Sequence, residues 1–157
     1  MNNFLKPKTY NLKPKRGFTL IEILITMAII AMLAATVIVA INPARQFATA
    51  RNTQRWAAVN SILNGVHQNM IDNHGTWNCA VSLPATATVI KETAGVDICS
   101  CLVTTYLVAL PYDPKTGSYT DCSTYDIGYT IFQDATTGRI TVAAPQAELG
   151  TSITITR

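Results

Sequence analysis

The chain has 157 residues, a formal net charge of +3 and hydrophobic residues at 48% of its positions, so we expect one domain plus appendages. Five of its 12 basic residues lie before Gly17 with no acid among them, at Lys6, Lys8, Lys13, Lys15 and Arg16. The rest of the chain contains the other seven basic residues and all nine acidic residues, so its net side-chain charge is about −2. A negative net charge argues against a nucleic-acid-binding surface. We expect no specific nucleic-acid partner.

The first 17 residues form a basic leader that we expect to be extended and removed. Pro7 and Pro14 would interrupt a helix there. Positive charge in front of an apolar helix keeps that end of a protein in the cytoplasm. The bulk of the chain is therefore expected on the other side of a membrane.

The next segment, residues 18–41, is predicted to be a membrane-spanning helix. From Ile23 to Ile41 it has no charged residue, and only Thr26 and Thr36 are polar. About 20 mostly apolar residues suffice to cross a bilayer, where every backbone group must pair within its own segment. An ordinary cleaved signal peptide is the alternative, but its apolar core has about 7–15 residues, and this run is longer.

Glu22 is the anomaly of this apolar run. A carboxylate inside a membrane helix costs about 3 kcal/mol and usually has a functional partner. Cleavage between Gly17 and Phe18 would create an α-amine four residues before Glu22, at a helix N-terminus whose dipole repels a cation. The carboxylate of Glu22 would offset that repulsion, in its own chain or in a neighbour's.

The run Lys15-Arg-Gly-Phe-Thr-Leu-Ile-Glu22 resembles the prepilin-peptidase site of type IV pilins and type II secretion pseudopilins. The resemblance implies cleavage after Gly17, N-methylation of Phe18, and pairing of Glu22 with the Phe18 amine of an adjacent subunit. It also implies a single-pass protein of the bacterial cytoplasmic membrane that later joins an extracellular or periplasmic filament. Its partners would be copies of itself or other pilins, the prepilin peptidase and methyltransferase, a membrane platform and an assembly ATPase.

Pro43 follows the apolar run and predicts a kink in a helix that continues to residue 71. Beyond it, the segment 42–75 is amphipathic and carries one apolar stripe. The stripe consists of Trp56, Val59, Ile62, Leu63, Val66 and Met70. Arg51 and Arg55 lie off the stripe.

This second helical segment is expected to end at residues 72–75. Either Asn73 or Gly75 would take the left-handed conformation that closes a helix. His67 and His74 are expected to be solvated or to cap the helix. We find no catalytic site around them and do not expect an enzyme.

Residues 76–157 are expected to form an extracytoplasmic globular β domain that covers the apolar stripe. Alternating apolar side chains predict strands at 86–91, 125–131, 139–144 and 151–156, with a hairpin turn at 134–139 and a helical turn or crossover at 102–110. Antiparallel strands after a long helix predict an α+β fold. Pilin-like proteins share this plan.

Four cysteines fit an extracytoplasmic domain with two disulfides. They are Cys79, Cys99, Cys101 and Cys122. Three pairings are possible, and a bond between Cys99 and Cys101 is disfavoured by its geometry. We favour Cys79–Cys99 with Cys101–Cys122. A zinc site with His74 is the alternative, but the cysteines lack paired C-x-x-C spacing.

Acidic residues gather in the loop 111–126, at Asp113, Asp121 and Asp126. Some pseudopilins bind calcium in a comparable loop, and oxygen-rich loops suit this ion. We otherwise expect no cofactor. Calcium is the candidate ion of this loop, and turn capping by the same carboxylates is the alternative.

Five tyrosines of the same domain could form an adhesive or DNA-stacking face, but packing in the core and across strands is favoured. They are Tyr106, Tyr112, Tyr119, Tyr125 and Tyr129.

Two functions follow from these features. The leading hypothesis is a structural subunit that is processed after Gly17 and polymerised into a type IV pilus-like or type II secretion filament. The alternative is a monomeric, single-pass, membrane-anchored binding module or periplasmic enzyme. N-terminal sequencing separates the two, because a methylated Phe18 excludes the plain anchor.

Overall fold

The computed structural model describes residues 17–157, so the predicted leader lies outside the described residues except for Gly17. The chain divides into two compact units, one that ends at Asn42 and one from Pro43 to Arg157.

The first unit contains helix α1 (Leu20–Ile41), whose 22 residues include no buried side chain. Thr19 caps its N-terminus in an extended conformation, and Asn42 closes its C-terminus in the left-handed region, with φ 48° and ψ 78°. Asparagine tolerates this region better than most residues. Its length and composition make α1 suitable for crossing a membrane, as predicted.

The second unit begins with helix α2 (Pro43–Asp72). Proline suits the first position of a helix, because its missing N–H would have no partner there. The predicted kink at Pro43 is therefore a full break: two helices are separated by Asn42 instead of one helix that bends. At the other end, Gly75 has φ 86° and donates its N–H to the carbonyl of Met70, which confirms the predicted cap.

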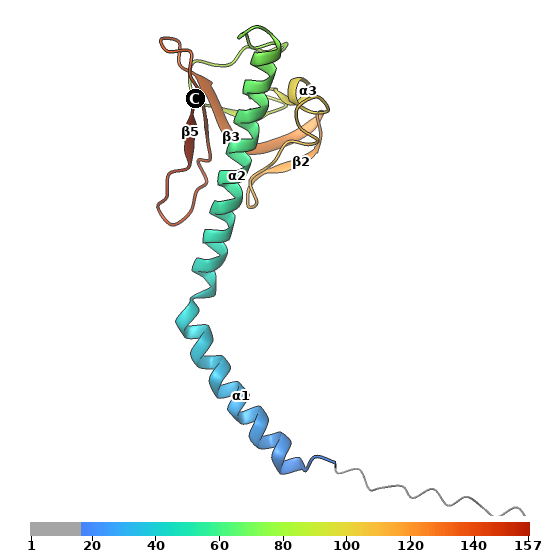
Figure 1. The fold of residues 1–157 in the computed structure, drawn as a ribbon, viewed down its shortest axis with the longest axis vertical. Coiled ribbons are helices and arrows are strands. Elements are labelled where there is room, and N and C mark those ends of the chain that lie inside the picture. The colour runs from blue at the N-terminus through green and yellow to red at the C-terminus, as the bar shows by residue number, and fades with distance from the viewer. Residues whose placement is uncertain (1–16) are drawn as a thin grey trace, which may run out of the picture. The chain divides into compact units, whose positions relative to one another are not determined.

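Five strands form one antiparallel sheet. The sheet lies behind α2 in the view of Figure 1. The strands are β1 (Thr88–Lys91), β2 (Ser118–Asp121), β3 (Thr124–Gln133), β4 (Ile140–Ala143) and β5 (Thr154–Thr156), and a short helix α3 (Cys99–Leu102) precedes β2. Their order is β1-β3-β4-β5, and β2 also pairs with β3. The α+β fold is thus as predicted, although the sequence analysis missed β2.

The core lies between α2 and the sheet. Alternate residues of β3 face it, from Tyr125 to Ile131, as their spacing predicted. They meet the stripe on α2 formed by Val59, Ile62, Leu63 and Val66, each fully buried. α2 contacts α3, β4 and β5, so α2 and residues 76–157 pack as a single unit.

Two positions on α2 differ from the prediction. Trp56, expected in the apolar stripe, is 39% exposed, whereas Arg55, expected off the stripe, is completely buried. Arg55 precedes Val59 by four residues and Ile62 by seven, so it lies on the inward face of the helix. Acidic partners inside the unit make its burial possible, as described below.

Candidate processing and assembly site

The predicted cleavage site lies in exposed, non-helical chain. Gly17 precedes α1, and a Cβ built on it would meet no atom within 4 Å. Its own structure therefore does not require glycine, so any need for glycine here must come from a protein that binds this segment. Phe18, the residue after the predicted cut, is 80% exposed. Both residues are accessible to an enzyme.

Thr19 and Glu22 together define the start of α1. The Thr19 side-chain oxygen accepts a hydrogen bond from the Glu22 backbone N–H at 3.2 Å. The spacing Thr-x-x-Glu is that of a capping box, and an acid in the first turn interacts favourably with the helix dipole. The role of Thr19 was missed in the sequence analysis, although this four-residue pattern could have revealed it.

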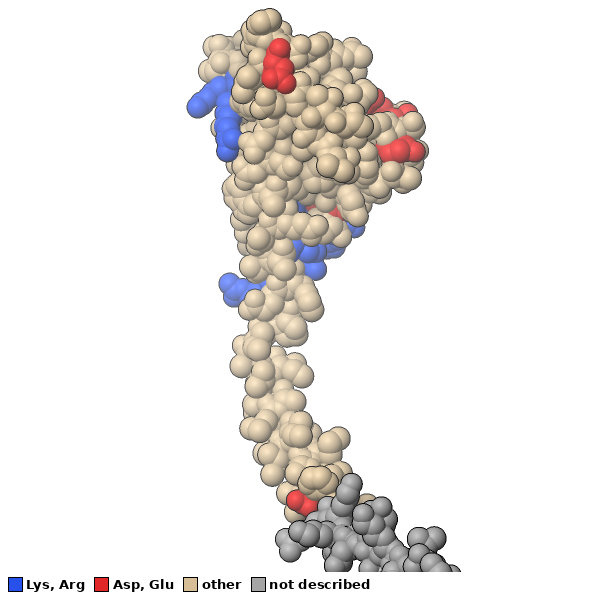
Figure 2. Space-filling view, turned by 45° about the vertical axis from the view of Figure 1, so that its right-hand side comes forward, with Lys and Arg blue, Asp and Glu red and all other residues tan. Residues whose placement is uncertain are grey.

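The remainder of α1 is an exposed apolar surface. Its large side chains range from 49% exposed at Ile23 to 93% at Leu20. The hydroxyls of Thr26 and Thr36 donate to the carbonyls of Ile23 and Leu33, so both are satisfied within the helix. Figure 2 shows the surface of α1 as uncharged, with red atoms only near its N-terminal end. Such a surface requires lipid or other apolar helices around it.

Residues 12–38 match the family model described as "Prokaryotic N-terminal methylation motif". The chain carries the cleavage and methylation motif of type IV pilins and pseudopilins. The match includes Gly17, Phe18 and Glu22 and supports a pilin-like or pseudopilin precursor. No curated protein and no solved structure matches the chain.

The globular unit contains two disulfides, which join Cys79 to Cys101 and Cys99 to Cys122. The favoured pairing of Cys79 with Cys99 and Cys101 with Cys122 is therefore wrong. Two residues apart on a helix means about 200° of rotation, so Cys99 and Cys101 point in different directions from α3. Cys99 is buried and faces the end of β2, the strand that the sequence analysis missed.

With all four cysteines in disulfides, none is available for the alternative zinc site. His74, the fifth group of that alternative, is exposed and has φ 57° in the turn after α2. The structure thus places His74 in a helix-closing position. His67 lies on α2 itself and is partly buried.

Arg55 and Asp113 form a buried ion pair at the centre of a larger polar network. The guanidinium of Arg55 donates to Asp113 through Nε at 2.6 Å and Nη2 at 3.2 Å, and both side chains are fully buried. Its Nη1 donates to Glu148 and to Asn52, each at 3.0 Å. Arg51 forms a bidentate pair with Glu148, in which Nε and Nη2 donate to the two carboxylate oxygens at 2.6 and 2.9 Å.

This network holds three distant parts of the chain together. It joins α2 to the loop at Asp113 and to the C-terminal segment at Glu148. Asn52 strengthens the last connection, because its side chain exchanges hydrogen bonds with the backbone of Glu148 at 2.8 and 3.0 Å. A bidentate arginine–carboxylate pair with further partners satisfies the charges that burial removes from water.

The network also sets the pKa values of its acids. Burial acts to raise the pKa of Asp113, but hydrogen bonds from Arg55 and from the backbone amides of Lys115 and Thr116 outweigh it, so the pKa is lowered. Hydrogen bonds from Arg51 and then Arg55 lower the pKa of Glu148 to about 2. Both carboxylates are therefore charged at neutral pH.

The predicted calcium cluster does not assemble among the described residues, in which no group of three metal-binding side chains occurs. The carboxylate of Asp113 is paired with the guanidinium of Arg55. Asp121 accepts from the backbone N–H of Ser123 at 2.8 Å, and Asp126 from that of Gly128 at 3.1 Å. Asp113 and Asp121 thus cap turns, the alternative that the sequence analysis left open, whereas Asp126 accepts its bond within β3.

The tyrosines do not form one common face. Tyr125 and Tyr129 are buried in the core, and Tyr119 packs its ring against Tyr125 with centroids 6.3 Å apart. The Tyr125 hydroxyl donates to Asp97 at 2.6 Å, whereas Tyr112 is exposed and Tyr106 is partly buried. This arrangement is the expected packing rather than an adhesive or DNA-stacking surface.

Proposed function

We propose that the chain is a filament subunit made as a membrane-anchored precursor. Residues 1–17 are removed as a leader, Phe18 is N-methylated, and α1 holds the protein in the cytoplasmic membrane with its N-terminus inside. The subunit then enters a type IV pilus-like or type II secretion filament, with other copies or related pilins as neighbours. The observation that carries this proposal is an entirely exposed apolar helix that lies largely within the matched methylation motif.

The driving force for assembly is the exchange of lipid contacts for helix–helix contacts along α1. Small residues such as Ala28, Ala31, Ala34 and Ala35 permit close approach of such helices. Glu22 supplies the register. In a correctly placed neighbour it meets the amine of Phe18, and in any other position it remains unpaired in an apolar surrounding.

Replacement of Gly17 tests the processing step. Gly17→Val has room in the free chain, so the precursor folds and inserts but is not cleaved. On a gel it runs as the longer form, and cells that express it lack filaments. The matched control is Gly75→Val, which strains the left-handed turn after α2 but leaves the cleavage site intact, so its product has mature length. Cleaved Gly17→Val protein would contradict the proposal.

A second candidate is the plain anchored module. It is favoured by the completeness of the unit from Pro43 to Arg157, which has its own core, sheet and disulfides. This candidate predicts that the chain stays monomeric and that Phe18 never becomes the N-terminus. Electron microscopy of cells that express the chain distinguishes the two, because only the first predicts filaments that contain it.

A further inference from the structure

The two tryptophans of the globular unit differ in how their indole N–H groups are satisfied. Trp77 donates its N–H to the carbonyl of Val81 at 2.8 Å. The N–H of Trp56 has no hydrogen-bond partner among the described residues, and the side chain is 39% exposed on α2. Tryptophan N–H groups find a partner when they become buried. The Trp56 N–H is thus left to water in this unit, and a partner that covers the side chain must supply an acceptor for it.

The polar side chains next to Trp56 already have hydrogen-bond partners within α2, so covering them costs little desolvation free energy. Its neighbours Thr49, Thr53 and Asn60 direct their side-chain donors to carbonyls of α2 itself, at 3.0–3.1 Å. None of these residues is charged. The guanidinium of Arg157 lies beside this face, because it donates to the side-chain oxygens of Asn64 at 2.8 Å and of Asn60 at 3.4 Å. A partner that covers Trp56 would bury an indole and satisfied hydroxyls, and it must leave this guanidinium in water or pair it.

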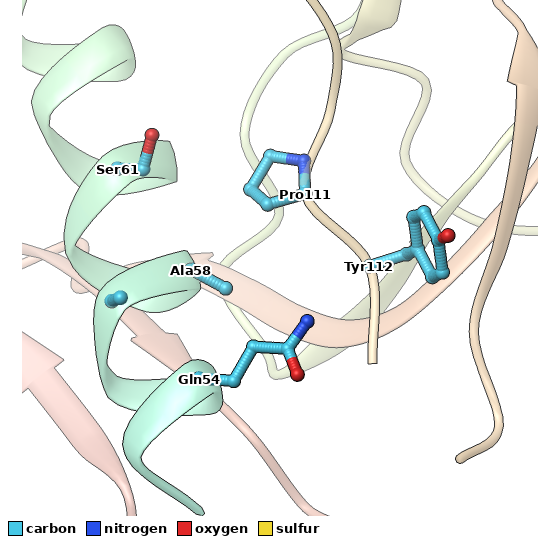
Figure 3. Close-up of a pocket in the computed structure, with 6 residues that line it drawn as sticks. Gln54, Ala58, Ser61, Pro111 and Tyr112 are labelled. Carbon is cyan, nitrogen blue, oxygen red and sulfur yellow. The ribbon is translucent and has the colours of Figure 1, made fainter. Parts of the chain in front are cut away.

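A groove lies on the opposite flank of the same helix, between α2 and the segment that follows Leu110. It is lined by Gln54, Ala57, Ala58, Ser61, Pro111 and Tyr112 and has a volume of about 350 Å³. Figure 3 shows Gln54, Ala58 and Ser61 on the helix, with Pro111 and Tyr112 across from them. The walls carry no charge, and the helix side combines two alanines with the uncharged polar side chains of Gln54 and Ser61. Such a site takes a flat, apolar side chain.

The groove also offers what the Trp56 indole lacks. The side chains of Gln54 and Ser61 make no hydrogen bond within the part of the chain that the structure describes, and both contain an oxygen that can accept one. The exposed Tyr112 supplies an aromatic ring for a tilted or stacked contact. Buried aromatic anchors in uncharged pockets are the usual centres of protein interfaces.

Groove and indole lie at the same level of α2. At about 100° per residue, Gln54, Ala58 and Ser61 are about 140–160° around the helix from Trp56. A contact between two different surfaces on opposite flanks repeats from copy to copy, and such contacts build open helical assemblies when they do not close into a ring.

We propose that Trp56 of one copy of this chain inserts into the groove of the next copy, with its N–H donating to Gln54 or Ser61. This inference rests on the filament function proposed above and names the contact between neighbouring globular units. Contacts along α1 and contacts at Trp56 then stabilise the same assembly from separate surfaces.

The test uses the full chain with Trp77→Phe, so that Trp56 is the only indole. On assembly from detergent-solubilised monomers into filaments, we expect its emission to shift to shorter wavelength and its quenching by acrylamide to fall. The matched control is Trp56→Phe, in which Trp77 reports and neither quantity changes. Filaments in which the emission and quenching of Trp56 equal those of monomers would overturn the inference but leave the proposed function intact.

Blocking the groove provides the second measurement. Ala57 is exposed on the groove wall, so Ala57→Arg fills the groove without disturbing the core. We expect filament yield to fall at least about tenfold, as for loss of an interface anchor. Trp56→Ala should have the same effect, and the double variant should be no worse than either.

The matched control for this substitution is Ala135→Arg, the same change at an exposed alanine in the turn between β3 and β4, which should assemble normally. Normal yield from Ala57→Arg or Trp56→Ala, or additive losses in the double variant, would overturn the inference. Absence of filaments from the wild-type chain would instead contradict the proposed function, and this inference with it.

Discussion

The two units of this chain differ in what covers their apolar surface. Residues 20–41 contain apolar side chains at nearly every position and bury none of them, whereas α2 has a narrow apolar stripe and buries it under its own sheet. Charge follows the same division. The first unit isolates one carboxylate, Glu22, whereas the second surrounds Arg55 with two acids. The second unit buries its apolar stripe within itself, whereas the apolar surface of α1 requires lipid or other helices around it.

The largest effect is expected at Glu22, the acid without a charged neighbour in its own helix. Glu22→Ala should retain membrane insertion and cleavage but abolish filaments, because the register between subunits is lost. Filament yield in sheared-cell fractions measures this. Thr26→Val is the matched control, since the Thr26 hydroxyl bonds only to its own helix, and it should assemble like wild type. Abundant filaments from Glu22→Ala would show that pairing with this carboxylate is unnecessary.

The next largest effect is expected at the buried ion pair. Arg55→Met removes the cation and leaves Asp113 charged and buried, which should lower the free energy of unfolding by about 3–5 kcal/mol. Urea unfolding of the full chain in detergent micelles, followed by tryptophan fluorescence, measures this. Arg51→Met is the control. It removes a partly exposed partner of Glu148 and should cost about 1 kcal/mol or less. Equal losses from the two variants would contradict the central role of Arg55.

Removal of one disulfide should produce a comparable or slightly smaller loss. The bond between Cys79 and Cys101 closes a loop of 22 residues, and cross-links of that length stabilise by about 3 kcal/mol. Replacement of both cysteines by serine should lower the unfolding free energy by that amount. The pairing itself is checked by mass spectrometry of non-reduced peptides. A peptide that links Cys79 to Cys99 would contradict the structure described here.

The smallest effect concerns pH. Asp113 and Glu148 have pKa values lowered in the folded state, so their contribution to stability is present above the unfolded values of about 4. It is lost as pH falls from about 4 towards 2, where Glu148 itself becomes protonated. Unfolding midpoints should therefore be constant between about pH 5 and 7 and should decrease below. Glu148→Gln should flatten part of this decrease, and an unchanged profile would count against the network.

Features that depend on local sequence were predicted well. The apolar run and the alternation along β3 are each determined by neighbouring residues. Pro43 marks a helix boundary, although the predicted kink is a break at Asn42. The basic leader stays a prediction, because it lies outside the described residues except for Gly17. Features that depend on contacts between distant parts of the chain were not predicted correctly. Trp56 and Arg55 are adjacent in sequence, and helical spacing allows either to join the stripe. Only the presence of Asp113 and Glu148, 58 and 93 residues away, decides in favour of Arg55.

The cysteines illustrate the same limit. Chain distance disfavours a bond between Cys99 and Cys101 but does not choose between the other pairings. That choice depends on the direction in which α3 presents each side chain and on β2, a four-residue strand with little alternation of its own. For the acids of the loop 111–126, turn capping and metal binding use the same oxygens. The position of Arg55 decided the role of Asp113.

The most direct test of the account is the N-terminus of the chain inside purified filaments. Mass spectrometry of proteolytic peptides should find N-methylated Phe18 as the first residue, with no peptide from residues 1–17. The amine that we propose to pair with Glu22 is created only by that cleavage. Intact filaments whose subunits still begin at Met1 would contradict the proposed processing and the pairing that depends on it.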